Sequence, residues 1–326
     1  MTPAWIAIGL AGALFANAVM ILDAQAQGTR PPSRIGVLHA AFAINHPSFE
    51  GFKDGLADAG FTEGRDVVFD VRFTSGVLEA YSDAARSVVA DGAKLIFAIS
   101  EPAVRAAREA AGDRPIVFAA VGDPVAAGIV TSIPRPEGNV TGVSSLSTDL
   151  MPKRLEILKQ ISPDVRRVHM VYNSGDPQSA AAAGLGAEAA LRLEIEFVGH
   201  PVHTAEGLAA ALAAFEPNDG GVTIESPSLD ISDQVLQRSL AIRMATIYSS
   251  AFWVRHGALV AFGADYYDMG RQAARLAAKI LRGAKPADVP VEGANAIHLT
   301  INLGTAKALG ISVPPALMIR ADELIE

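Results

Sequence analysis

The strongest constraint on the fold is a regular alternation that begins at residue 34. Short runs rich in β-branched residues alternate with longer segments of helical periodicity. Such alternation predicts parallel sheets whose strands are connected by helices. A first series of strands and helices fills residues 34–144, and a second of similar length follows it without repeating the residues. The chain is therefore predicted to be an α/β protein with two doubly wound, Rossmann-like lobes and a ligand cleft between them.

The expected elements follow directly from the pattern. In the first series the strands are 34–38, 67–73, 95–99, 116–118 and 140–143, and the helices are 48–59, 78–91, 101–111 and one that opens near residue 123. In the second series the helices are 150–161, 178–191, 205–215, 233–244 and 251–256, and the strands are 167–172, 193–198, 221–224, 246–248 and 259–262.

Composition limits the possible functions. The chain has 326 residues, of which 50% are apolar and 19% charged, enough material for two cores of ordinary size. The formal net charge is -8 and there is no long basic run, so nucleic acid is not expected as a partner. Cysteine is absent, which excludes disulfides, thiolate metal sites, thiol nucleophiles and a lipid-carrying cysteine.

The N-terminal segment differs from the rest of the chain. Residues 6–22 form an almost uninterrupted apolar run, followed by Ala24, Gln25 and Ala26 in an A-x-A pattern. This pattern predicts a signal peptide over residues 1–26, cleaved before Gln27, and a linker over residues 27–33. The segment before the run contains no Lys or Arg. An uncleaved membrane anchor is therefore the alternative, although 17 residues is at the short limit for a span.

The loops that follow the strands are the predicted ligand site, because ligands of such folds bind beyond the carboxyl ends of the strands. These loops are rich in Ser, Asn and carboxylates with a few aromatic residues, a mixture that suits a small zwitterion. The same residue types also cap helices and form turns, and the rings could belong to the core. The candidates are Phe42, Ser100, Glu101, Asp123, Tyr172, Asn173, Glu225, Ser250, Asp265 and Tyr266.

Several segments of the sequence resemble those of one known family. They are Val-Gly-Asp-Pro-Val at 121–125, Gly-Ile-Val at 128–130, Arg-Pro-Glu-Gly-Asn-Val-Thr-Gly-Val at 135–143, Lys-Arg-Leu-Glu-Ile-Leu at 153–158, and the stretches 279–292, 301–310 and 320–325. Together they are similar to the ABC transporter substrate-binding protein family, which includes tryptophan and tyrosine receptors. The similarity extends from about residue 34 to the C-terminus.

The resemblance implies a periplasmic location and the type I periplasmic-binding fold, also called periplasmic binding protein-like I. It implies lobe one at 34–146 plus about 265–299, and lobe two at 147–264 plus about 300–326. Asp123 and Thr141 are expected on the cleft edge of lobe one, and Asp265 near a crossover. The implied partners are a small-molecule ligand, amino-acid-like and possibly aromatic, and an importer made of a permease and an ATPase.

Motifs for other chemistry are weak. Gly184 and Gly186 belong to a relaxed dinucleotide fingerprint, but it lies inside an Ala-rich helix instead of at a strand-to-helix turn. His200 and His203 are close in sequence but have no neighbouring third ligand, and no G-x-S-x-G elbow is present. No cofactor and no metal are therefore expected.

The sequence thus predicts a receptor and not an enzyme, because its loops supply hydrogen-bonding groups without a base beside a nucleophile. The protein is expected to be a monomer whose lobes close on the ligand by hinge motion near residues 144–150 and at Asp265 and Tyr266. Two alternatives stay open. One is an exported α/β enzyme, and the other is a ligand-sensing subunit of a membrane signalling system.

Overall fold

The computed structural model describes residues 31–39, 46–75, 77–223 and 231–326. The predicted signal peptide, most of the linker, and the candidates Phe42 and Glu225 lie outside these residues. Within the described ranges, no helix combines the length and apolar character needed to cross a bilayer.

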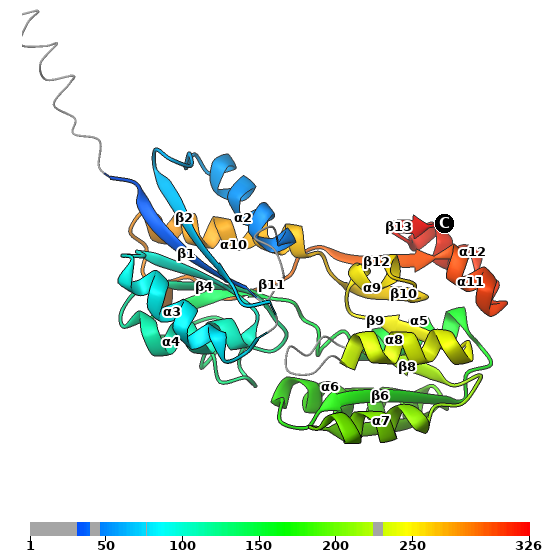
Figure 1. Cartoon of the computed structure of the whole chain (residues 1–326). Coiled ribbons are helices and arrows are strands. Elements are labelled where there is room, and N and C mark those ends of the chain that lie inside the picture. Colours follow the sequence, from blue (N-terminus) through cyan, green and yellow to red (C-terminus); the bar gives the residue numbers. More distant parts are fainter. Residues whose placement is uncertain (1–30, 40–45, 76, 224–230) are drawn as a thin grey trace, which may run out of the picture.

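Two sheets, each flanked by helices, form the two lobes (Figure 1). Lobe one contains β1 (Ser33–His39), α2 (Pro47–Asp58), β2 (Val67–Phe73), α3 (Ala80–Ala90), β3 (Leu95–Ile99), α4 (Glu101–Ala111), β4 (Ile116–Val121), β5 (Val140–Ser144), α10 (Tyr266–Leu281) and β11 (Glu292–Gly293). Lobe two contains α5 (Met151–Ile161), β6 (Arg167–Asn173), α6 (Pro177–Arg192), β7 (Glu196–Val202), α7 (Ala205–Ala213), β8 (Gly220–Val222), α8 (Ile231–Ile242), β9 (Ala245–Tyr248), α9 (Ala251–Arg255), β10 (Val260–Ala264), β12 (Ile297–Asn302), α11 (Leu303–Leu309), α12 (Pro315–Arg320) and β13 (Glu323–Ile325).

The strand orders confirm the predicted doubly wound α/β architecture. The first sheet has the order β11-β5-β4-β3-β1-β2, and its paired strands are all parallel. The second sheet has the order β13-β12-β10-β9-β8-β6-β7. Its pairs are parallel except β10 with β12, which are antiparallel, and this pair departs from the parallel sheet that the sequence predicts.

In lobe one the period-two alternation of each strand supplies two separate cores. Ile35 and Val37 of β1 pack against α2 and α10, whereas Leu38 packs against α3 and α4. Figure 1 shows these two helix pairs on opposite faces of the sheet. In lobe two, α5, α6, α11 and α12 cover one face, and α7, α8 and α9 cover the other.

Helix α10 follows a strand of lobe two, yet it belongs to lobe one because it packs closely on α2. A Cβ atom on Gly51 would lie 1.9 Å from the Tyr267 carbonyl oxygen, and one on Gly270 would lie 2.0 Å from the Ser48 carbonyl oxygen. Glycine at both positions therefore lets the two helix backbones touch. This contact attaches α10 firmly to lobe one, although more than 200 residues separate its partners.

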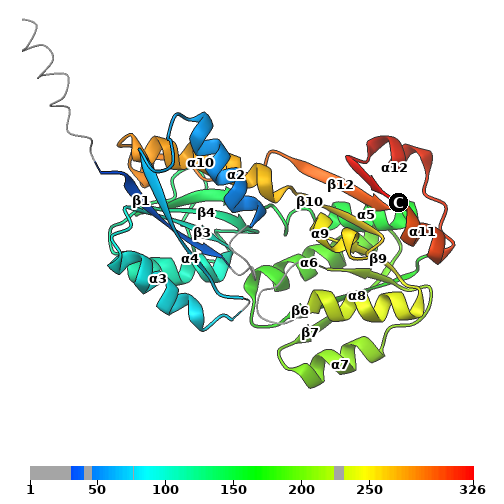
Figure 2. The ribbon, with the colours of Figure 1, turned by 45° about the horizontal axis from the view of Figure 1, so that its top comes forward.

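The chain crosses between the lobes at three places (Figure 2). The first crossing is at residues 145–150 and the second is at Asp265, between β10 and α10. The third is at residues 294–296, because β11 pairs with β5 of lobe one and β12 begins at Ile297 in lobe two. This crossing comes a few residues before the boundary near 299 that the resemblance implies.

The helix predicted to open near residue 123 does not form. Asp123 instead closes a turn, in which its Oδ1 accepts from the backbone N–H groups of Val125 and Ala126. Gly128 then adopts a positive φ of 65°, which ends any helical course. The segment up to β5 carries Pro134 and Pro136, and neither can donate a backbone hydrogen bond.

Candidate ligand-binding cleft

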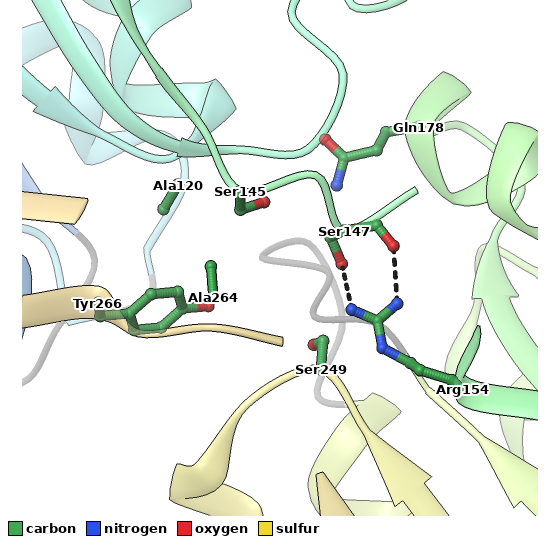
Figure 3. Close-up of a pocket in the computed structure, with 8 residues that line it drawn as sticks. All are labelled: Ala120, Ser145, Ser147, Arg154, Gln178, Ser249, Ala264 and Tyr266. Carbon is green, nitrogen blue, oxygen red and sulfur yellow. Dashed lines mark hydrogen bonds between the residues drawn. The ribbon is translucent and has the colours of Figure 1, made fainter. Parts of the chain in front are cut away.

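A pocket lies between the lobes, beside the first and second crossings (Figure 3). It encloses about 350 Å³ of space not filled by protein atoms, part of it open to solvent. The lining residues are Ala120, Ser145, Ser147, Arg154, Gln178, Ser249, Ala264 and Tyr266.

The pocket lining is mostly polar. Ser145 and Ser147 come from the first crossing, and Ser249 follows β9 of lobe two. Gln178 lies in the first turn of α6, and Tyr266 begins α10 after the second crossing. The two lobes therefore both contribute to one small cavity, which can surround a ligand with hydroxyl and amide groups.

Arg154 is fully buried, with a relative exposure of 0%, and lies in the first turn of α5. Its Nε donates to the Phe262 carbonyl oxygen over 2.8 Å, and its Nη1 donates to the Ser147 carbonyl oxygen over 2.7 Å. Its Nη2 is 3.4 Å from the Ser147 Oγ (Figure 3). Because Ser147 belongs to the first crossing and Phe262 to the strand before the second, this guanidinium ties the two crossings together.

A second contact joins the lobes directly. The backbone N–H of Gly122, after β4 of lobe one, donates to Gln178 Oε1 of lobe two over 2.9 Å. A Cβ atom at Gly122 would lie 2.5 Å from the Gln178 carboxamide, so a side chain here would push Gln178 away. The absence of a side chain at Gly122 thus permits the approach of the two lobes at this point.

The backbone around the cleft is strained in lobe one. Ser100, Ala120 and Leu146 adopt positive φ values of 94°, 60° and 55°. A positive φ is costly for residues other than glycine and recurs at functional sites. Ala120 lines the pocket, while Ser100 and Leu146 lie at the end of β3 and in the first crossing. These three positions lie at the cleft side, whereas Ser75 follows β2 and Glu137 precedes β5.

The carboxylates proposed from the sequence are held by local contacts. Glu101 forms an ion pair with Arg105 one turn later in α4, at 2.6 Å. Asp123 caps its turn, and Asp265 caps α10 by accepting from the Asp268 backbone N–H over 2.9 Å. Burial, with a smaller effect of the Asp123 charge, raises the pKa of Asp149. None of these residues lines the described pocket.

The remaining candidates are spread around the cleft. Ser100 begins α4 with its hydroxyl 3.4 Å from the Tyr81 hydroxyl, and Ser250 caps α9. Tyr172 packs against the core of lobe two, and Asn173 Oδ1 accepts from the Gly175 backbone N–H. Thr141 is fully buried and donates to the Val289 carbonyl oxygen over 2.7 Å. Among the described candidates, Tyr266 lies in the pocket lining.

Sequence reasoning indicated loops that reach the pocket, and of the described candidates it named Tyr266 among the lining residues. The loops at Ser144 and Ser145, at Ser249 and Ser250, and before Tyr266 all reach the pocket. Polar Ser pairs after predicted strands were the available signal for Ser145 and Ser249. Arg154 gave no such signal, because it lies inside an amphipathic helix where a surface position is expected. Ala120, Ser147, Gln178 and Ala264 were also missed.

Two histidines stand beside the pocket in lobe one. The ring of His46 lies 5.9 Å from that of Tyr266 and 5.5 Å from that of His39. His46 Nδ1 also accepts from the Ser48 backbone N–H at the start of α2. Burial, with a smaller effect of His39, lowers the pKa of His46 to about 4. The imidazole is therefore neutral at physiological pH. In the described part of the chain, no three potential ligands group as a metal site would require.

Comparison with known proteins decides the family. The family model described as ABC transporter substrate binding protein matches residues 38–325, nearly the whole chain beyond the N-terminal segment. The chain belongs to the ABC transporter substrate-binding protein family. The resemblance found in the sequence is thereby confirmed.

Individual relatives agree with this assignment. A tyrosine-binding protein of Clostridioides difficile strain R20291 is 30% identical over 290 residues, covering 86% of this chain and 83% of that protein. A conserved domain protein from Vibrio cholerae superimposes with a TM-score of 0.80 at 27% identity, covering 90% of this chain and 99% of the other. A ligand-free, open substrate-binding protein with adhesive properties from Clostridium difficile has a TM-score of 0.69 at 26% identity, covering 90% and 99%.

Fold similarity extends to a ligand complex. An ABC domain from Streptococcus pneumoniae, solved with L-Trp, has a TM-score of 0.79 at 24% identity and covers 90% of this chain and 100% of its own. At this identity the likeness establishes the fold, which is the two-lobed type I periplasmic-binding architecture.

Proposed function

We propose that this protein is the receptor of an ABC importer that captures an amino-acid-like solute, with an aromatic amino acid as the first class to test. The observation that carries the proposal is the pocket itself. It lies between two lobes and is lined by hydroxyl and amide groups from both, which are the kinds of polar group that orient small ligands.

The relatives support the ligand class. A related protein is named for tyrosine binding, and a structure of the same fold was solved with L-Trp. Tyr266 supplies an aromatic ring to the pocket, and ring stacking is a common way to hold an aromatic side chain. Substrate-binding proteins of this family work outside the cytoplasmic membrane and deliver small ligands to a permease. Export by the N-terminal segment and a periplasmic, monomeric state complete the proposal.

Capture involves closure of the lobes about the crossings at residues 145–150 and at Asp265. An enclosed ligand must enter through an open form, and extended crossings absorb rotation at low cost. The lower TM-score against the structure described as open, at nearly the same identity as the Vibrio cholerae protein, is consistent with a different lobe arrangement here. The bond between Gly122 and Gln178 spans the lobes and belongs to this arrangement.

A thermal-shift screen of the purified exported protein against amino acids tests the function. At a ligand concentration of 100 times Kd, the native state gains about 2.7 kcal/mol, which raises the melting temperature measurably. Ser249→Trp should fill the pocket and abolish the shift, whereas Ala210→Trp, on the exposed face of α7, should keep it.

Recovery of the ligand separates a receptor from an enzyme. We expect the released ligand to be chemically unchanged after prolonged incubation, and small-angle scattering to show a smaller radius of gyration in the bound state. If the ligand still raises the melting temperature of the Ser249→Trp variant, the ligand binds outside this pocket. Turnover of the ligand would favour the exported-enzyme alternative.

A further inference from the structure

A second pocket, called the base pocket below, lies in lobe one at the strand ends opposite to the cleft. It encloses about 1050 Å³ of space not filled by protein atoms, part of it open to solvent, against about 350 Å³ for the interlobe pocket measured in the same way. The start of β1 marks its place, far from lobe two (Figure 1, Figure 2). Its lining includes Ser33, Arg34, Lys94, Leu95, Ile280 and Leu281. A ligand held between the lobes therefore does not reach this pocket.

Two cations stand side by side in the lining of the base pocket. Arg34 of β1 and Lys94, just before β3, precede the paired residues Ile35 and Leu95. The Lys94 backbone N–H donates to the Arg34 carbonyl oxygen over 2.7 Å, which confirms that the two residues are neighbours across the sheet. Like charges on neighbouring strands repel each other. The pair is therefore unfavourable unless an anion binds to it.

The described residues supply no such anion. No carboxylate is among the described residues that line the base pocket. The side chains of Arg34 and Lys94 are exposed, and neither forms an ion pair or a hydrogen bond within the described part of the chain. Both cations are thus available to a ligand.

Another part of the lining is apolar. Ile280 and Leu281 end α10 and pack on the same core as the fully buried Leu95. Their side chains are not completely covered, since Ile280 keeps an exposure of 8% and Leu281 is half-buried. An apolar surface beside two cations fits a ligand that has an anionic group and a hydrocarbon part.

The end of α10 does not oppose an anion strongly. The carboxyl end of a helix carries a partial negative charge on its unpaired carbonyl oxygens. Here the backbone N–H groups of residues 282–284 donate to the carbonyl oxygens of residues 278–280 over 2.8–3.1 Å. Lys279 and Arg282 add positive charge at the same helix end. The charge around the base pocket therefore favours an anion.

We propose that the base pocket binds an amphiphilic phosphate ester, with the phosphate on Arg34 and Lys94 and the hydrocarbon part against Ile280 and Leu281. A guanidinium can donate two parallel hydrogen bonds to phosphate oxygens, and an ammonium adds a point charge. The phosphate replaces the repulsion between the two cations by attraction to both. Such an ester is either free in solution or the headgroup of a membrane lipid.

Titration calorimetry of the exported protein with hexyl phosphate, methyl phosphate and hexanol tests the site. We expect hexyl phosphate to bind about tenfold more tightly than methyl phosphate, because its methylene groups leave water, and hexanol not to bind measurably. Arg34→Gln combined with Lys94→Gln should weaken hexyl phosphate binding at least tenfold. Arg192→Gln combined with Lys307→Gln removes the same charges from exposed positions of lobe two and should change the affinity less than twofold.

Three results would overturn the proposal. The first is hexyl phosphate binding that is absent or is equal in the wild-type protein and the Arg34/Lys94 double variant. The second is equal affinity for hexyl and methyl phosphate, which would leave only a surface anion contact. The third is loss of hexyl phosphate binding in Ser249→Trp, because this change fills the interlobe pocket and leaves the base pocket intact. Failure of the cleft to bind an amino acid would not affect these measurements.

Flotation with vesicles of phosphatidylcholine and phosphatidic acid distinguishes the two sources of the ester. Flotation of the wild-type protein that is lost in the Arg34/Lys94 double variant would identify a lipid headgroup as the ligand. Binding of hexyl phosphate without flotation would identify a free phosphate ester. Equal flotation of both proteins would exclude the headgroup as the ligand of the base pocket.

Discussion

Two carboxylates that follow strands, Asp123 and Asp265, are called the acidic rim below, and they use their polar atoms differently from the pocket serines Ser145, Ser147 and Ser249. Asp123 and Asp265 accept hydrogen bonds from backbone N–H groups two or three residues later in the chain. Ser145 and Ser147 of the first crossing and Ser249 after β9 line one cavity. In this structure the two carboxylates therefore stabilise local turns, whereas the three serines line the interlobe pocket.

The largest expected effect is on the free energy of unfolding, and it distinguishes the buried Arg154 from the exposed Arg192. Arg154→Ala removes the donors that satisfy the Phe262 and Ser147 carbonyl oxygens and leaves a cavity. We expect the free energy of unfolding to fall by about 3–5 kcal/mol. Arg192→Ala, which is exposed, should change it by less than about 0.5 kcal/mol. Urea denaturation measures both, and equal losses would refute the structural importance of the buried guanidinium.

The next effect is the pH dependence of the free energy of unfolding that we expect from His46, on the lobe-one side of the pocket. The pKa of His46 is lowered to about 4 in the folded protein and is ordinarily 6.5, so the unfolded state binds the proton more tightly. The contribution of the neutral His46 to the free energy of unfolding is therefore fully present above pH 6.5, and it is lost as the pH falls toward 4. Its upper bound is about 3.5 kcal/mol, at about 1.4 kcal/mol per pKa unit.

Replacement by Asn keeps a capping acceptor and removes the titration. His46→Asn should therefore reduce the loss of unfolding free energy between pH 6.5 and 4, while His203→Asn, at an exposed position, should not. Burial and the neighbouring His169 also lower the pKa of His200, so part of the acid sensitivity will remain. An unaltered pH profile in His46→Asn would contradict the burial of a neutral imidazole.

A smaller effect is expected where the lobes touch. Gly122→Ala displaces the Gln178 carboxamide and removes a hydrogen bond that spans the cleft. One such bond contributes about 1 kcal/mol, so affinity should weaken roughly fivefold to tenfold. Gln178→Ala should cost more, because it also removes an amide group from the pocket lining, and the double variant should cost little more than Gln178→Ala alone. Fully additive losses in calorimetry would indicate that the two residues act independently.

The smallest effect should come from the rim. Asp123→Ala loses both accepted backbone bonds and should lower the free energy of unfolding by about 1 kcal/mol, whereas Asp123→Asn keeps an acceptor and loses less than half of this. Affinity should stay within twofold in both variants. A tenfold loss of affinity in Asp123→Asn at unchanged stability would instead place a ligand ammonium on the rim.

The sequence predicted the fold better than the site for a physical reason. Strand and helix positions follow from periodic burial, which the alternation of apolar residues records directly, as in Ile35 and Val37 on one face and Leu38 on the other. The antiparallel β12 was missed because its direction depends on how the chain returns from lobe one. The turn at Asp123 was mistaken for a helix start because both use Asp followed by Pro.

The site depends on tertiary contacts that local patterns do not record. From the sequence alone, Arg154 is expected at the surface of α5. Its burial depends on contacts such as the one with Phe262, 108 residues later in the chain. Gly122 likewise acquires its role only from Gln178, 56 residues away. Asp265 and Ser250 carried the expected polar signal, but helix capping uses that signal first.

A crystal structure of the exported protein with the ligand found by screening tests the central claim most directly. We predict that the ligand lies between the lobes with a polar group within hydrogen-bond distance of the Ser145, Ser147 or Ser249 side chain. A ligand held instead by the rim carboxylates, or bound outside the interlobe cleft, would contradict the account.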